Sequence, residues 1–202
     1  MKKIMLDLYS GLGGASEAFM LNPKWEVHRL ENNLLLKEVP NTKIQDITTW
    51  DFYKEIPVGY YDLIWASPPC DDFSLGFNAP GPRAQRKKEH FTPDMQHLTR
   101  SLEIIRFLKP KWWVIENVAG ASKIFSDFLE VEKPTQIIRP YFLWGKFPHI
   151  EMPYGWEMLL GKTARWDIDD PLRKNKRGKV DFEVSSALMR AVDSQTTLED
   201  WV

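Results

Sequence analysis

The sequence lacks the residues and segments on which several classes of protein depend. A single cysteine among 202 residues excludes an intramolecular disulfide, and four scattered histidines offer no zinc-ligand spacing. No apolar stretch reaches the roughly 18 residues needed to span a bilayer. The 28 acidic residues almost cancel the 27 basic ones, so no global positive field gathers nucleic acid. We therefore expect a cytoplasmic protein with no membrane or metal partner, in which a local patch binds any polyanion.

The sequence does contain short apolar runs that alternate with helix-like segments. Strands are predicted at 4–8, 25–30, 61–66, 112–115 and 137–144, and helices at 15–21, 95–108 and 184–192. Thr92-Pro93-Asp94 is typical of a helix start, whereas 71–91 lacks periodicity and predicts a long functional or mobile loop. This order predicts a mostly parallel α/β sheet. After Pro148 the regularity fades, so we expect one domain at 1–149 and a small irregular region at 150–202.

Glycines separate the first predicted strand from the first predicted helix, in Asp7-Leu8-Tyr9-Ser10-Gly11-Leu12-Gly13-Gly14. Such a turn lets backbone amides approach a nucleotide-like ligand, although a tight turn without a ligand explains it equally well. Glu31, about 20 residues later, favours the ligand because an acid at that position binds ribose hydroxyls. Asp46 follows the next possible strand, where it is able to accept a hydrogen bond from an exocyclic amine.

Two reactive side chains follow the later strands. Cys70, in Ser67-Pro68-Pro69-Cys70, is the only thiol. Such a cysteine is more often a small buried hydrophobe, but its place behind two prolines at a strand end suits an exposed nucleophile. Glu116, in Glu116-Asn117-Val118, is either an ordinary carboxylate or a general acid whose pKa is raised by apolar surroundings. Both are expected at the ligand-binding edge of the sheet.

These three motifs, in this order, resemble those of the DNA (cytosine-5)-methyltransferases over residues 3–148. The resemblance implies an α/β fold with a class I, S-adenosylmethionine-dependent, Rossmann-like methyltransferase sheet, and a reduced target-recognition region with a C-terminal helix at 150–202. It also implies methyl transfer from S-adenosylmethionine to C5 of a flipped-out cytosine in duplex or single-stranded DNA, with S-adenosylhomocysteine as product. Cys70 would form a covalent bond to C6, and Glu116 would protonate the base or share a proton with it.

The resemblance also assigns the remaining candidate site residues. Arg139, in Thr135-Gln136-Ile137-Ile138-Arg139-Pro140-Tyr141, would contact the base; the family usually has a second arginine where Ile137 stands. The family usually has glutamine after the nucleophile, where this chain has Asp71. The cofactor would be bound by the first motif and by residues after the next three strands, namely Asp7, Leu8, Tyr9, Ser10, Gly11, Gly13, Gly14, Glu31, Asn32, Asp46, Ile47 and Pro68.

Two basic clusters are expected to contact nucleic-acid phosphates, although solvated charge runs explain them equally well. One consists of Arg83, Arg86, Lys87 and Lys88, and the other of Arg173, Lys174, Lys176 and Arg177. The final asparagine-containing motif of the family is not recognisable, and residues 184–192 are expected as its shortened substitute. The alternatives are the same chemistry on RNA, transfer of a modified alkyl group, and a non-catalytic DNA- or cofactor-binding module. The presence of both Cys70 and Glu116 argues against the last.

Overall fold

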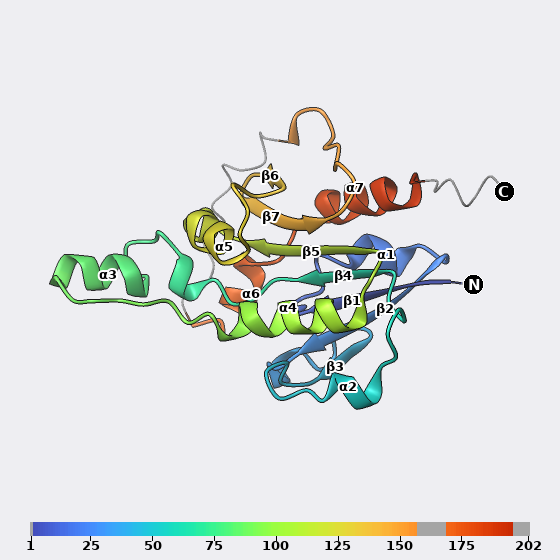
Figure 1. Ribbon diagram of the computed structural model, residues 1–202, viewed down its shortest axis with the longest axis horizontal. Helices are drawn as coiled ribbons and strands as arrows, with labels where there is room; N and C mark the ends of the chain where they lie inside the picture. The colour runs from blue at the N-terminus through green and yellow to red at the C-terminus, as the bar shows by residue number, and fades with distance from the viewer. Residues whose placement is uncertain (1, 157–168, 196–202) are drawn as a thin grey trace.

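The computed structural model describes residues 2–156 and 169–195, which adopt a mixed α/β architecture (Figure 1). In this part of the chain the strands form one seven-stranded sheet of order β3-β2-β1-β4-β5-β7-β6. The strands are β1 (Lys3–Leu8), β2 (Trp25–Glu31), β3 (Thr42–Ile44), β4 (Leu63–Ala66), β5 (Trp112–Asn117), β6 (Gln136–Ile138) and β7 (Tyr141–Lys146). β1 to β5 run parallel, and β7 pairs antiparallel with β5 and β6. The predicted Rossmann-like class I fold is confirmed.

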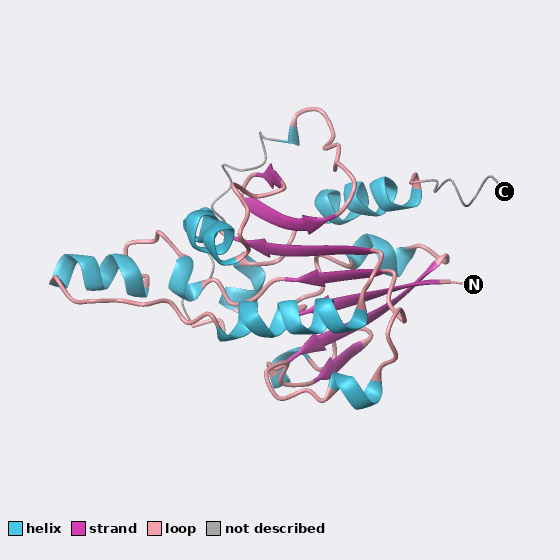
Figure 2. Ribbon diagram, in the orientation of Figure 1, coloured by secondary structure: helices cyan, strands magenta, loops and turns pink. Residues whose placement is uncertain are grey.

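Helices cover both faces of this sheet (Figure 2). One face carries α4 (Gln96–Leu108) and α5 (Ser122–Phe128), and the other carries α1 (Glu17–Leu21) and α7 (Phe182–Asp193). The short elements are α2 (Phe52–Glu55), α3 (Pro80–Lys87), α6 (Arg173–Arg177) and the 3-10 helices η1 (Leu34–Leu36), η2 (Asp71–Phe73) and η3 (Ala119–Ala121). Among the described helices, none is long and apolar enough to cross a membrane. The described residues also contain no group of three or more side chains placed to hold a metal ion.

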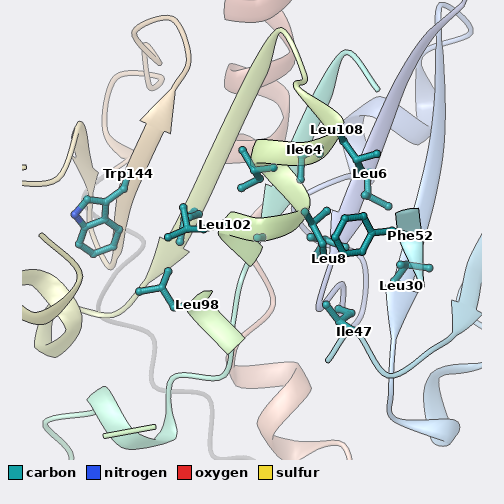
Figure 3. Packing of buried hydrophobic residues seen from close by; sticks show 14 of the residues in the cluster. Leu6, Leu8, Leu30, Ile47, Phe52, Ile64, Leu98, Leu102, Leu108 and Trp144 are labelled. Atoms are coloured by element: carbon teal, nitrogen blue, oxygen red, sulfur yellow. The ribbon is translucent and has the colours of Figure 1, made fainter. Parts of the chain in front are cut away.

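The central strands are apolar on both faces because each face packs against helices. In β4, Ile64 and Ala66 belong to the core on the α4 side, whereas Leu63 and Trp65 belong to the core on the α1 and α7 side. This alternation follows from the two-residue period of a strand. Figure 3 shows the first core, where strand residues such as Leu6, Leu8 and Ile64 meet α4 through Leu98, Leu102 and Leu108.

The structure corrects the prediction that residues 71–91 form a structureless loop. This segment contains η2 and the eight-residue helix α3, which projects from the body of the molecule (Figure 1). Within α3 only Ala84 is buried, so the sequence Pro80–Lys87 has no apolar face by which the helix could be recognised. Asp72 accepts a hydrogen bond from the Asp94 backbone amide at 2.9 Å, and this bond closes the base of the excursion.

Two further boundaries differ from the predictions. α4 begins at Gln96, so Thr92 is not its N-cap; Asp94 instead accepts a hydrogen bond from the Gln96 amide at 2.8 Å. The apolar run 137–144 is not one strand but parts of β6 and β7, which reverse direction at Arg139-Pro140. Pro140 has no backbone N–H and therefore cannot continue the ladder of one strand.

α7 includes the predicted helix 184–192 and is tied to α1 through Ser185. The Ser185 hydroxyl donates to the Ala15 carbonyl at 2.7 Å and accepts from the Ala18 amide at 3.1 Å, and all these groups are buried. The described part of 150–202 thus includes an element that packs against the sheet's own helices. A domain boundary at 149 stays a prediction, and residues 157–168 and 196–202 of the expected recognition region lie outside the described residues.

We predict that Ser185→Ala lowers the free energy of unfolding by about 1–3 kcal/mol, because it leaves a buried amide and a buried carbonyl without this partner. Urea unfolding followed by tryptophan fluorescence measures the change. Ser186→Ala is the matched control, since the neighbouring hydroxyl only accepts an exposed hydrogen bond from Arg190. Equal effects of the two variants would contradict the assigned role of Ser185.

Candidate active site

The candidate residues meet at the edge of the sheet where the parallel strands end. Leu8 pairs with both Leu30 and Ala66, and Ala66 pairs with Ile115, so β1, β2, β4 and β5 end at the same level. Glu31 and Glu116 lie in the last residues of β2 and β5, and the segments after β1 and β4 carry the glycine turn and Cys70. In Figure 1, α3, α5 and α6 lie toward this edge, away from the labelled ends of the chain. Open α/β sheets bind ligands at this edge.

The glycine turn is enclosed so tightly that two of its positions exclude a side chain. A Cβ on Gly13, whose φ is +74°, would lie 2.4 Å from the Arg29 guanidinium carbon. A Cβ on Gly14 would lie 2.2 Å from the Val180 carbonyl oxygen. The turn therefore presents backbone rather than side chains at the edge, which is the form that lets a nucleotide-like ligand approach.

A buried hydrogen-bond network supports the turn from within the protein. Arg29 donates through Nε to Ser16 Oγ at 2.8 Å and through Nη2 to the Gly13 carbonyl at 3.0 Å. Ser16 Oγ in turn donates to Asp7 Oδ2 at 2.5 Å. Burial raises the pKa of Asp7 to about 6, against the opposing effects of Ser16 and Arg29. Asp7 thus supports the turn indirectly, through Ser16 and Arg29, rather than at its surface. No role was assigned to Arg29 from the sequence, although a basic residue inside a buried strand was a signal for one.

Glu31 links the end of β2 to the turn. Its Oε2 accepts from the Gly11 amide at 2.8 Å, while Oε1 accepts from the amides of Asn32 and Asn33 at 3.0 and 2.9 Å. The residue is 7% exposed. These bonds fix the carboxylate beside the glycine turn, as the ribose-binding interpretation requires, and they place Asn32 there through its backbone.

The other predicted cofactor residues differ in what they present. Leu8 and Ile47 are buried in the core, so their side chains face away from the edge. The Tyr9 hydroxyl donates to the His97 carbonyl at 3.1 Å. Asp46 is exposed, and hydrogen bonds from the Thr48 hydroxyl and amide lower its pKa. Asp46 is therefore an ionised acceptor at neutral pH.

Cys70 is an exposed free cysteine directly before η2. The carbonyl of Pro68 accepts a hydrogen bond from Asn117 Nδ2 at 2.9 Å, and Asn117 is 1% exposed, so β5 fixes the proline segment. Partial burial raises the pKa of the Cys70 thiol, and the charges of Glu116 and Asp71 raise it further, whereas Lys174 lowers it. Sequence reasoning did not assign a role to Asn117, although it stands inside the third motif, Glu116-Asn117-Val118.

Glu116 lies in β5, beside the strand that leads to Cys70. Burial raises its pKa from 4.5 to about 7, and a hydrogen bond with Ser67 opposes this rise. Near neutral pH a large fraction of the side chain is therefore protonated. It is able to donate a hydrogen bond or a proton at the edge of the sheet.

A family model described as C-5 cytosine-specific DNA methylase matches residues 4–127, which include the glycine turn, Cys70 and Glu116. The chain belongs to this family. The predicted family is confirmed.

Two curated proteins are similar to this chain. A "Probable DNA (cytosine-5)-methyltransferase" of Frog virus 3 (isolate Goorha) is 30% identical over 118 residues, which cover 56% of this chain and 52% of the viral protein. The type II methyltransferase M.DdeI of Desulfomicrobium norvegicum is 29% identical over 124 residues, 57% of this chain and 28% of that protein. The chain thus spans about half or less of these relatives. The solved structure of the Entamoeba histolytica methyltransferase EhMeth is similar, with 14% sequence identity and a TM-score of 0.47. The match covers 76% of this chain and 56% of EhMeth.

Arg139 occupies the turn between β6 and β7. Because β7 runs antiparallel to β5 and begins near Asn117, this turn lies toward the same edge as Glu116. Arg139 is exposed, and among the described residues it has no hydrogen-bonding or ion-pair partner. Its contact with a base stays a prediction.

The two basic clusters are carried by separate helices. Arg83, Arg86 and Lys87 lie on α3 and Lys88 directly follows it, whereas the second cluster lies on α6. On α3, the Arg86 guanidinium lies 3.8 Å from the Phe77 ring centre, and Lys87 lies 3.9 Å from Glu89. On α6, Lys174 pairs with Asp71 at 3.0 Å and Lys176 pairs with Asp170 at 2.6 Å. The cations of α6 are therefore partly neutralised by carboxylates, and phosphate binding by either cluster stays a prediction.

Residues 173–181 cross the edge of the sheet, and their contacts could not be anticipated. Asn175 accepts a hydrogen bond from Asn33 at 3.3 Å, and Lys179 pairs with Glu17 at 2.7 Å. Asp181 accepts from the Tyr141 hydroxyl at 2.8 Å. Each contact joins positions at least 40 residues apart, so no local pattern signals them. This segment, together with α7, lies beside the glycine turn.

We predict that Glu116→Gln changes how stability depends on pH. The folded-state pKa of Glu116, about 7, lies above the ordinary 4.5, so its stabilising proton is held fully below pH 4.5 and is lost as the pH rises through 7. Glutamine does not ionise. The free energy of unfolding of the variant, relative to wild type, should therefore rise by about 1–3 kcal/mol between pH 5 and pH 8.

Urea unfolding of both proteins at the two pH values measures this difference. The raised pKa of Asp7 contributes equally to both proteins and cancels in the comparison. A difference that is the same at pH 5 and pH 8 would show that Glu116 has an ordinary pKa.

Proposed function

We propose that this chain transfers a methyl group from S-adenosylmethionine to C5 of cytosine in DNA. One arrangement carries the proposal. The exposed thiol of Cys70, behind two prolines, follows β4, and the Glu116 carboxyl group, with a pKa of about 7, lies near the end of the neighbouring β5, at the edge that bears the glycine turn. Family membership and the names of both curated relatives support it. Residues 1–149 would be the catalytic domain and 150–202 the reduced target-recognition region.

The side chains at the edge fit S-adenosylmethionine. Positions 11, 13 and 14 of the turn are glycines, so the turn presents backbone there, and Glu31 stands beside it to accept ribose hydroxyls. Asp46, ionised and exposed, is able to accept from the exocyclic amine of adenine. When bound, the cofactor supplies an electrophilic methyl group on a sulfonium centre.

Cys70 is proposed to begin the reaction by adding to C6 of the cytosine. The sulfur–carbon bond forms as the thiol proton leaves to solvent, and the electron pair of the C5–C6 double bond moves into the ring. Glu116 gives a proton or hydrogen bond to N3 and stabilises the electron-rich ring. C5 then takes the methyl group, loses its proton to a water-borne base, and re-forms the double bond as Cys70 leaves C6. Glu116 recovers its proton from N3.

In the free protein, Cys70 is in its less reactive, protonated form, whereas Glu116 is largely in the protonated form that the reaction requires. The raised pKa of Cys70 keeps the thiol protonated in the free protein, whereas Glu116 is substantially protonated near pH 7. The thiol must therefore lose its proton on attack rather than before it.

A cytosine inside a duplex cannot reach Cys70, so the base would be flipped out, at a cost of about a few kcal/mol. The exposed cations of α3, on a helix that projects beyond the edge, would hold the flanking phosphates. Single-stranded DNA would avoid the cost of unpairing. Both forms of DNA are thus proposed substrates.

We predict a denaturant-stable adduct between Cys70 and DNA that contains 5-fluorocytosine, in the presence of S-adenosylmethionine. Fluorine does not leave C5 as a proton does, so the covalent intermediate accumulates. Gel electrophoresis with peptide mapping detects it, and Cys70→Ser should form none and lower turnover by at least about a thousandfold. The same assay with 5-fluorocytosine in transfer RNA, and the product mass on ordinary DNA, test the RNA and modified-alkyl alternatives.

An adduct only with RNA would overturn DNA as the substrate. No adduct on any nucleic acid, with cofactor binding demonstrated by calorimetry, would favour a non-catalytic module.

We predict that Glu31→Ala weakens S-adenosylmethionine binding about ten- to a hundredfold, the loss expected for hydrogen bonds to a charged acceptor. Isothermal titration calorimetry measures the Kd. Glu26→Ala is the control, because Glu26 lies on the same strand but pairs with His28 at the surface. An unchanged Kd for Glu31→Ala would remove the ribose contact.

A further inference from the structure

Asp71, which follows Cys70, is paired with a cation from the far end of the chain. Lys174 Nζ lies 3.0 Å from Asp71 Oδ1, although the two residues are 103 positions apart. Asp71 opens η2, whose Phe73 amide donates to the Cys70 carbonyl at 3.1 Å. The carboxylate thus belongs to the same short turn as the thiol, and Lys174 reaches that turn from α6.

α6 is held across the edge at a second point, which makes this approach specific. Asn175, the next residue, bonds to Asn33 at 3.3 Å and lies 3.7 Å from the position of a Cβ on Gly11. The Gly178 amide donates to the Lys174 carbonyl at 2.9 Å and closes the helix. Lys174 is therefore carried by a helix that is anchored on the glycine-turn side, and its side chain extends to the nucleophile side.

Three charged groups act on the Cys70 thiol from the elements around it. Glu116 of β5 and Asp71 of η2 oppose the thiolate, and Lys174 of α6 favours it. Glu116 is substantially protonated near neutral pH, and Asp71 is the acid that directly follows the thiol in the chain. Its partner Lys174 is the one cation in this set.

We propose that Lys174 is a positioning residue that, through its ion pair with Asp71, offsets the negative charge beside Cys70 and makes the thiol more reactive. This proposal rests on the role of Cys70 as nucleophile. It assigns Lys174 to the chemistry of the site rather than to DNA phosphate, and it explains how this chain tolerates an acid directly after its nucleophile. The pair is exposed, with side-chain exposures of 83% and 59%, so the effect is modest and sensitive to salt.

The rate of alkylation by iodoacetamide tests the proposal without DNA or cofactor. The thiolate sulfur displaces iodide from the reagent, and the single cysteine makes the label unambiguous. Lys174→Met should slow alkylation at pH 7 about two- to threefold at low salt, the range expected for exposed charges, and should shift the pH–rate profile upward without changing its plateau. The difference should fade in about 1 M NaCl, and Lys174→Arg should restore the wild-type rate.

Lys123→Met is the matched control. Lys123 is 85% exposed and pairs with Asp127 at 2.8 Å on α5, so its replacement changes the net charge equally without touching the nucleophile turn. Asp71→Asn should speed alkylation, and in that background the effect of Lys174→Met should shrink to less than half, because the lysine has lost the carboxylate that holds it.

Two results would overturn the proposal: an unchanged pH–rate profile for Lys174→Met, or an effect of the same size in the Asp71→Asn background. An unchanged profile together with weaker DNA binding would make Lys174 a phosphate contact. These outcomes are independent of the adduct assay, so a failure of the proposed methyl transfer and a failure of this inference are distinguishable.

Discussion

The candidate site depends on the close packing around the turn that follows β1. The Arg29 guanidinium fills the space behind Gly13, and the Val180 carbonyl fills the space against Gly14. A turn enclosed from both sides keeps one backbone shape, which is what recognition by main-chain amides requires. The same packing fixes the segment 173–181 relative to the sheet, and it thereby determines where α6 meets the turn that carries Cys70. The glycine turn and the turn that carries Cys70 are thus connected through the segment 173–181, which contacts both of them.

Burial at the edge of the sheet has opposite consequences for Glu116 and Cys70, the two groups that we propose to react. Burial favours the neutral form of both, which for Glu116 is the form able to donate a proton and for Cys70 is the less nucleophilic form. The burial that prepares the acid therefore hinders the thiol. The cation of Lys174 offsets part of the effect on the thiol, and it leaves the burial of Glu116 unchanged. Burial also raises the pKa of Asp7 inside the fold. There the hydrogen bond from Ser16 and the charge of Arg29 stabilise the buried carboxyl group.

Sequence reasoning succeeded where a local pattern has a single physical meaning. Apolar runs that end in glycine, proline or an acid gave the central strands, and their common edge brought Glu31, Cys70 and Glu116 together. It failed at α3, because Pro80–Lys87 buries only Ala84 and has no apolar face to detect. It joined β6 and β7, because an apolar run does not reveal that Arg139-Pro140 reverses the chain. The partners Asn33 and Asn175 were beyond reach, since a contact across 142 positions depends on the whole fold.

The attachment of α7 to the first elements of the sheet also bears on how the chain folds. Asp193 accepts from Lys3 at 2.9 Å and from the Trp25 indole at 3.1 Å, and Ser185 bonds to the turn before α1. Contacts of such long sequence separation slow folding because their loop-closure entropy must be overcome before they form. During synthesis on the ribosome, the apolar face of β1 that α7 covers stays open until residue 193 has left the exit tunnel. This face of β1 is therefore covered only after all the other strands of the described sheet have been made.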